Sequence, residues 1–290
     1  MWQWFQFIRP KTLTASVVPF FAGACLAQAK GADINIGLLL SAITAALFIQ
    51  IGSNLVNDAA DFDKGADDEK RLGPRRAIQQ GVATSRQVYA AAFASFVLAL
   101  ISSIPIIAHG GWVIAFIVIV SIIAACAYTA GPYPLAYCGL GDLFVLIFFG
   151  WVATAAGYWI QSGKVDMSSF VLGTQIGLLC MVLIAINNLR DIAGDERVGK
   201  RTLAVRFGKT FARFEITLAL YLPFILSLYW LLQGNLYAAT FPWGVFFAAI
   251  ILVRKVWSQE PSQAYNQFLG LAALLHLTFG ILIGIGFHLE

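Results

Sequence analysis

The sequence contains few charged residues and few cysteines or histidines. Only 12% of its 290 residues are Asp, Glu, Lys or Arg, whereas a soluble domain carries about 25%. These charges cannot cover a globule of this size, so most of the outer surface must face lipid rather than water. The four Cys form no C-x-x-C pair and the three His are scattered, which argues against a disulfide framework and a zinc site.

What the sequence has instead is a series of long uncharged stretches. A helix needs about 20 apolar residues to cross the hydrocarbon layer of a bilayer, which is about 30 Å thick. Turn-like segments divide the longest stretches at His109-Gly110-Gly111, Gly131-Pro132-Tyr133-Pro134 and Gln233-Gly234-Asn235. The expected spans cover residues 12–29, 34–57, 87–108, 111–130, 143–163, 167–189, the two parts of 216–253, and 261–289. We therefore predict an all-α integral membrane protein with nine transmembrane helices, forming a single domain over residues 1–290.

The basic residues are distributed unevenly between the ends of these spans. If the N-terminus is placed in the cytoplasm, all of the 19 Lys and Arg residues except Lys30 and Lys164 fall on the cytoplasmic side. Cytoplasmic loops of membrane proteins carry such an excess of basic residues. We therefore expect a cytoplasmic N-terminus, a location in the inner (cytoplasmic) membrane, and a site that opens toward the cytoplasm.

Two clusters of Asn and Asp residues end the second and the sixth span. If the second span stays helical for two more turns, residues spaced at i, i+3, i+4 and i+7 share one face. The first cluster has this spacing and consists of Asn54, Asn57, Asp58 and Asp61. The second cluster has one-turn spacing and consists of Asn187, Asp191 and Asp195. Each cluster is followed along the chain by a basic loop on the expected cytoplasmic side.

The chemistry of these clusters points to a bound cation. Carboxylates on one helical face repel one another, and an Asp within a bilayer costs about 2.5–3.5 kcal/mol even on lenient scales. Ligands that offer only oxygen favour Mg²⁺ or Ca²⁺ over zinc, and Mg²⁺ commonly combines carboxylates with phosphate oxygens of a substrate. The clusters therefore predict a site for magnesium and a diphosphate group. The alternative is a solvated loop whose charges balance locally, which we favour for Asp63, Asp68 and Glu69.

Motifs along most of the chain support a resemblance to a known family. The first cluster reads Asn57-Asp58-Ala59-Ala60-Asp61, followed by Gly65 and Asp67. The other motifs are Arg9-Pro10-Lys11-Thr12-Leu13, Arg71-Leu72-Gly73-Pro74-Arg75, Tyr128-Thr129-Ala130-Gly131-Pro132 with Gly139-Leu140-Gly141-Asp142, and Asn187-Asn188-Leu189-Arg190-Asp191 with Gly199-Lys200-Arg201-Thr202-Leu203-Ala204-Val205-Arg206. Together they resemble the UbiA superfamily of intramembrane aromatic prenyltransferases. Gly65 stands where many members have a further Asp, and the pattern with Asp67 resembles the branch that prenylates 1,4-dihydroxy-2-naphthoate for menaquinone synthesis.

The resemblance implies a UbiA-type bundle around a central cavity. It also implies transfer of a polyprenyl group from a polyprenyl diphosphate to the naphthoate, with loss of CO₂ and diphosphate and with Mg²⁺ as cofactor. The implied metal ligands are Asn57, Asp58, Asp61, Asp67, Asp191 and Asp195. The implied diphosphate contacts are Lys11, Arg71, Lys200 and Arg201. Tyr128 and Asp142 are implied to orient the acceptor hydroxyls, which makes them catalytic candidates beside Asp61, Asp191 and Asp195.

Alternatives remain for single residues and for the whole function. Asp58 could support its helix, Lys11 could be an interfacial anchor, and Asp142 could cap the fifth span. The acceptor could be 4-hydroxybenzoate or homogentisate, although residues 129–141 lack the Lys that hydroxybenzoate-type relatives carry there. A secondary transporter would place charges near the bilayer midplane, where this chain has none. No feature of the sequence indicates a nucleic-acid partner.

Overall fold

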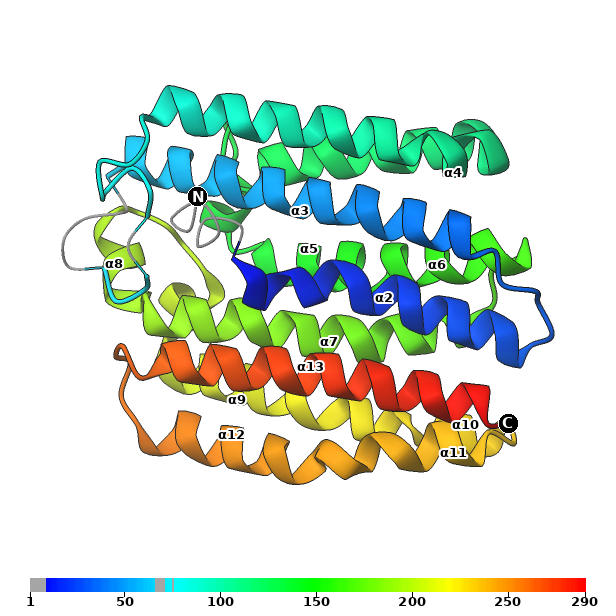
Figure 1. Ribbon diagram of the computed structural model, residues 1–290. Helices are drawn as coiled ribbons and strands as arrows, with labels where there is room; N and C mark the ends of the chain where they lie inside the picture. Colours follow the sequence, from blue (N-terminus) through cyan, green and yellow to red (C-terminus); the bar gives the residue numbers. More distant parts are fainter. Residues whose placement is uncertain (1–8, 66–70, 75) are drawn as a thin grey trace.

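The computed structural model describes residues 9–65, 71–74 and 76–290, and in these residues every regular element is helical. Eight of the helical segments are long and apolar enough to cross a membrane. Figure 1 shows these helices side by side, with their axes running in one common direction. The prediction of an all-α integral membrane protein is therefore confirmed.

Most of the membrane-length segments lie close to the spans expected from the sequence. Those that form a single element are α2 (Pro10–Ala29), α3 (Ile36–Asp63), α7 (Met167–Arg190), α13 (Tyr265–His288) and α4 (Ser85–Ala127), which contains two of the expected spans. The others are built from shorter pieces: α5 (Gly141–Val145), η2 (Leu146–Val152) and α6 (Ala153–Ser162); α9 (Leu203–Leu226) and α10 (Leu228–Leu232); and α11 (Leu236–Thr240), η3 (Phe241–Val245) and α12 (Phe246–Ser258). Two short helices, η1 (Leu135–Cys138) and α8 (Ile192–Arg197), lie in the connections.

The long helix α4 reverses direction at Gly111, whose dihedral angles are not helical (φ 63°, ψ −153°). In a continuous helix Phe96 and Ile122 would lie about 39 Å apart, at a rise of about 1.5 Å per residue. They belong instead to the same apolar cluster, so the two halves of α4 return to the same part of the bundle. The predicted break at His109-Gly110-Gly111 is thus present, while the count of nine crossings and the side of the N-terminus stay predictions.

Close packing of glycines brings the fifth span against α7. A Cβ atom on Gly150 would lie 2.6 Å from the carbonyl oxygen of Gly173 and 2.9 Å from the Cα of Gly177. Small residues allow membrane helices to approach in this way. Gly150 lies in η2, a π-helical stretch, and such stretches often occur at functional sites. Here it contributes Phe148 to the wall of the central cavity described below.

The two acidic clusters lie at the same end of the bundle, the end that holds α8 in Figure 1. The opposite end holds a small polar network in which Lys30 Nζ contacts an Asp166 carboxylate oxygen at 2.7 Å and Tyr158 donates to the same oxygen at 2.9 Å. Burial by itself would raise the pKa of Asp166, but these hydrogen bonds hold it below its ordinary value. The network ties together α2, α6 and the start of α7.

Candidate active site

The bundle contains a cavity of about 1040 Å³ with a polar end and an apolar end. With one exception, every candidate residue that the structure describes lines it: Lys11, Asn57, Asp58, Asp61, Arg71, Tyr128, Asp142, Asp191, Asp195 and Lys200. The exception is Arg201, whose side chain is exposed outside this lining. Asp67 lies outside the described residues.

The first acidic cluster is held on one face because α3 stays helical as far as Asp63. This extension was the condition for the predicted stripe, and it is confirmed. All members of the stripe line the cavity, and Asn54, Asp58 and Asp61 are buried. Tyr137 donates its hydroxyl proton to Asp61 Oδ1 at 3.0 Å, so this carboxylate is held from outside its own helix.

The second cluster keeps its one-turn spacing although α7 ends at Arg190. The backbone N–H of Asp191 donates to the carbonyl of Asn187 at 3.0 Å, and the N–H of Asp195 donates to the carbonyl of Asp191 at 2.8 Å. These bonds continue the helical i to i+4 pattern into α8. Asn187, Asp191 and Asp195 therefore line the same cavity as the first cluster.

Lys200 lies among carboxylates of both clusters. Its Nζ is 3.6 Å from Asp195 Oδ1. Burial would lower the pKa of Lys200, but attraction to the charges of Asp61, Asp195 and Asp191 raises it above its ordinary value. Burial raises the pKa of Asp195 to about 6, an effect that the charge of Lys200 opposes. The acids of α3 and of the α7–α8 junction thus share one electrostatic environment.

Asp191 is also paired with its neighbour Arg190. The guanidinium donates from Nε to Asp191 Oδ1 at 2.9 Å and from Nη2 to Oδ2 at 2.6 Å. Burial would raise the pKa of Asp191, but the hydrogen bonds and charge of Arg190 hold it below its ordinary value. Arg190 Nη1 further donates to Asn266 on α13 at 2.7 Å, so this pair is fixed to a distant helix. Asp191 is therefore ionised and oriented.

Asp58 has a different environment from the other acids. Its Oδ1 accepts from both Arg9 and Arg76, and the Asp58 and Arg76 side chains are only 3% and 9% exposed. These contacts join the start of α2, the end of α3 and the following loop. Asp58 thus differs from the other acids in that one of its carboxylate oxygens is shared by two arginines from neighbouring segments.

The polar end offers a donor set that suits Mg²⁺. Within the described part of the chain, no group of three or more His, Cys, Asp or Glu is already close enough to hold a metal. Asn57, Asp61, Asp191 and Asp195 nevertheless line one cavity, and their side chains carry oxygen donors of the kind that binds Mg²⁺. Lys200 and Arg190 both place positive charge among these acids. The residues fit the ion by their chemistry and their common cavity.

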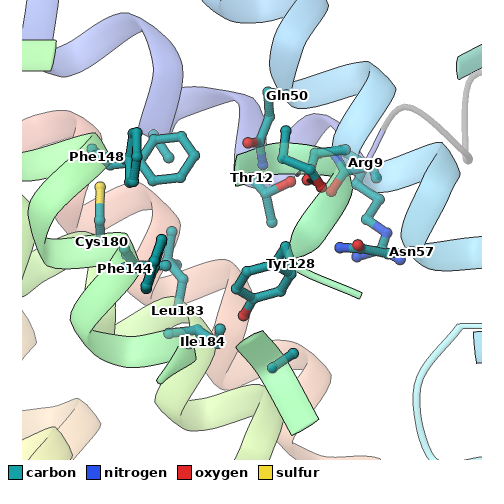
Figure 2. A pocket seen from close by; sticks show the side chains of 18 of the residues that line it. Arg9, Thr12, Gln50, Asn57, Tyr128, Phe144, Phe148, Cys180, Leu183 and Ile184 are labelled. Atoms are coloured by element: carbon teal, nitrogen blue, oxygen red, sulfur yellow. Dashed lines mark hydrogen bonds between the residues drawn. The ribbon is translucent and has the colours of Figure 1, made fainter. Parts of the chain in front are cut away.

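Tyr128 lies where the polar and apolar parts of the cavity meet. Figure 2 shows its ring between Arg9 and Asn57 on one side and Phe144 and Phe148 on the other. The rings of Phe144 and Phe148 are stacked, with centroids 5.6 Å apart. The apolar wall also includes Cys180, Leu183 and Ile184.

Asp142 is buried in the first turn of α5 and lines the cavity. Its Oδ2 receives a long hydrogen bond of 3.4 Å from Asn188 Nδ2, whereas its Oδ1 has no hydrogen-bond partner among the described residues. The residue at the N-cap of α5 is Leu140, so Asp142 does not cap this helix. A buried carboxylate oxygen of this kind is available to a hydroxyl of a bound molecule.

Comparison with known proteins identifies the family of this chain. The family model described as the UbiA prenyltransferase family matches residues 16–278. The chain belongs to the UbiA prenyltransferase family. It is 37% identical over 261 residues to a protein of Escherichia coli named 1,4-dihydroxy-2-naphthoate octaprenyltransferase, a match that covers 87% of this chain and 83% of the relative. A Bacillus subtilis protein of the same name is 33% identical over 263 residues, covering 91% and 81%.

A solved UbiA homologue has the same fold. The structure of a UbiA homologue from Archaeoglobus fulgidus bound to DMAPP and Mg²⁺ superposes with a TM-score of 0.67 at 15% identity, covering 97% of this chain and 98% of that one. The UbiA-type bundle expected from the motifs is therefore confirmed. The likeness also shows that a homologue of this fold holds a divalent metal together with an allylic diphosphate.

Some residues of this UbiA-family site could not be nominated from the sequence. Tyr137 and Asn266 contact the acidic clusters but stand outside charged or repeated patterns. Arg76 belongs to a basic loop and to none of the motifs, although it is buried against Asp58. Of these residues, only Arg190 could have been predicted from the sequence, because a cation next to an Asp at a helix end suggests an ion pair.

Proposed function

We propose that this chain transfers a polyprenyl group from a polyprenyl diphosphate to 1,4-dihydroxy-2-naphthoate, releasing diphosphate and CO₂ and forming demethylmenaquinol for menaquinone biosynthesis. One observation carries the proposal: two acidic clusters and their basic neighbours line the polar end of a cavity whose other end is apolar. Such a cavity matches a substrate with a diphosphate head and a hydrocarbon tail. The names of the bacterial relatives support the choice of the naphthoate as acceptor.

The polar end of the cavity would bind the diphosphate head together with Mg²⁺. Asn57, Asp61, Asp191 and Asp195 would hold the metal, which when bound neutralises the negative charge of the leaving diphosphate. Lys11, Arg71 and Lys200 line the same end and would contact phosphate oxygens. We leave Arg201 and Asp58 out of this set, because the first is exposed outside the cavity lining and the second is paired with two arginines.

The reaction requires charge separation in a site that excludes water. The bond between C1 of the prenyl chain and the diphosphate oxygen breaks, and its electron pair leaves with the diphosphate. Only interactions that are stronger in this separated state accelerate the step, which is the contribution of the cations at the polar end. The apolar wall with Phe144 and Phe148 keeps water from the allylic cation, and their ring faces can stabilise positive charge.

The acceptor would lie against Tyr128 and Asp142. The free Oδ1 of Asp142 would accept a hydrogen bond from one acceptor hydroxyl, which increases the electron density of the ring. The ring carbon that bears the carboxylate then bonds to C1 of the prenyl chain. Loss of CO₂ returns the electron pair of the carbon–carbon bond to the ring and restores its aromaticity.

The location of the site follows from the same proposal. The chain is an integral membrane protein. We place it in the inner membrane with its polar end toward the cytoplasm, because the basic residues gather at that end and because polar substrates would reach it there. We propose that residues 1–290 act as one transmembrane domain, since one cavity receives residues from α2 to α13.

The proposal is tested by product analysis with purified protein. Mg²⁺, an isoprenyl diphosphate and 1,4-dihydroxy-2-naphthoate labelled in its carboxyl carbon should give a prenylated product and labelled CO₂ in equal amounts. Neither 4-hydroxybenzoate nor homogentisate should be prenylated. Turnover of one of those acceptors instead would change the assigned substrate, and uptake of a solute without any product would favour a transporter.

A further inference from the structure

The loop between α4 and α5 contacts both Asn57 and Asp61, the candidate metal ligands on α3. The hydroxyl of Thr129 donates to Asn57 Oδ1. The hydroxyl of Tyr137 donates to Asp61 Oδ1 at 3.0 Å. Thr129 is buried, and Tyr137 lies in η1 behind Asp61 rather than in the cavity wall. Tyr137 thus reaches Asp61 from outside the cavity lining, whereas Thr129 is itself part of that lining.

Lys64, at the end of α3, connects these two loop residues. Its ammonium donates to the carbonyl oxygen of Thr129 at 2.6 Å and lies 4.3 Å from the centre of the Tyr137 ring. Lys200 Nζ lies 5.6 Å from the same ring centre. Ammonium groups within about 6 Å of a ring are attracted to its face. The ring of Tyr137 is therefore fixed by two cations while its hydroxyl holds Asp61.

The backbone of η1 is fixed as well. The N–H of Arg201 donates to the carbonyl of Tyr137 at 3.1 Å, and Arg206 Nη2 donates to the carbonyl of Cys138 at 2.8 Å. The loop that carries Tyr137 is thus attached to the segment that carries Lys200. Movement of either segment would change the orientation of Asp61.

We propose that Tyr137 and Thr129 are positioning residues, whose hydroxyls orient Asp61 and Asn57 for divalent-cation binding. This inference rests on the proposed function, because it takes these two residues as ligands of the metal that binds the diphosphate. Groups that hydrogen-bond to metal ligands fix their geometry, and their loss commonly weakens metal affinity by about 10- to 100-fold. Tyr137 carries out this task from outside the cavity lining, and Thr129 through a hydroxyl that is bound to Asn57.

The test compares variants that remove one hydroxyl each. Tyr137→Phe keeps the ring that faces Lys64 and Lys200, and Thr129→Val keeps the backbone carbonyl that accepts from Lys64. Tyr133→Phe is the matched control, because Tyr133 lies in the same loop and is 81% exposed. Two quantities are measured: the half-saturating Mg²⁺ concentration for prenyl transfer, and the affinity for Mg²⁺ by calorimetry on purified protein with inorganic diphosphate.

Both variants should raise the half-saturating Mg²⁺ concentration and the calorimetric dissociation constant by about ten-fold. The maximal rate at saturating Mg²⁺ should stay within about two-fold of the wild type, as should both quantities for Tyr133→Phe. A merely structural role would lower the melting temperature and the activity at every Mg²⁺ concentration without moving either constant. That result, or an equal shift in the control, would overturn the inference. If the wild type transfers no prenyl group at all while calorimetry still shows the shift, the proposed function fails and the positioning role stands.

Discussion

Replacement of Asp58 by Asn distinguishes a supporting acid from a metal ligand. The carboxylate of Asp58 is 3% exposed and pairs with Arg76, whose side chain is 9% exposed, and with the more accessible Arg9. Removing one partner of a buried ion pair costs about 3–5 kcal/mol, because the remaining charge stays buried without compensation. Asn keeps one oxygen acceptor, so we expect a loss near the lower limit, about 3 kcal/mol. For a chain of 290 residues this corresponds to a fall in melting temperature of roughly 5 °C.

The assay follows thermal unfolding in detergent together with the half-saturating Mg²⁺ concentration. Asp58→Asn should lower the melting temperature while leaving the Mg²⁺ requirement of the folded protein within about two-fold of wild type. Asp63→Asn is the matched control, because Asp63 lies on the same helix end, is exposed and contacts Ser85. An unchanged melting temperature combined with a lost Mg²⁺ response would refute the reasoning and return Asp58 to the ligand set.

Two further predictions concern the stability of the fold. The pKa of Asp166 lies below its ordinary value, so its pairing with Lys30 should stabilise the protein above about pH 4. This stabilisation should be lost as the pH falls through the lowered pKa. The melting temperature of Asp166→Asn should therefore not show this fall in acid. Gly150→Ala should destabilise by about 1–3 kcal/mol, since its Cβ would meet the backbone of Gly173 at 2.6 Å. Gly244→Ala, whose nearest contact would be an ordinary 3.7 Å, should leave the melting temperature unchanged.

Hydrophobic runs and one-turn spacings were enough to predict most of the fold. Uncharged windows located the membrane spans to within a few residues, and the glycine pair before Trp112 located the reversal inside α4. The windows miss the start of α9 at Leu203, because the charged residues Arg206 and Lys209 lie on either side of a break in this helix at Gly208. A helix can carry charges at the membrane surface that a charge-free window excludes.

The roles within the acidic stripe were harder to predict than the stripe itself. Asp58 and Asp61 are three residues apart on one face, so spacing alone assigns them the same role. What separates them is the packing of the next loop, which brings Arg76 to Asp58, and of η1, which brings Tyr137 to Asp61. Contacts between segments so far apart in sequence leave no periodic pattern. Arg201 is a similar case: it belongs to a motif of the sequence, but the packing of its loop leaves it outside the cavity lining.

The most direct test is a crystal or cryo-EM structure of the protein with Mn²⁺ in place of Mg²⁺ and with geranyl diphosphate, in which anomalous scattering or density locates the metal. Metal ions bridging the diphosphate to both Asp61 on α3 and Asp191 at the end of α7 are the expected result. Metal held by one cluster alone, or a diphosphate bound away from these two carboxylates, would contradict the assignment of the site.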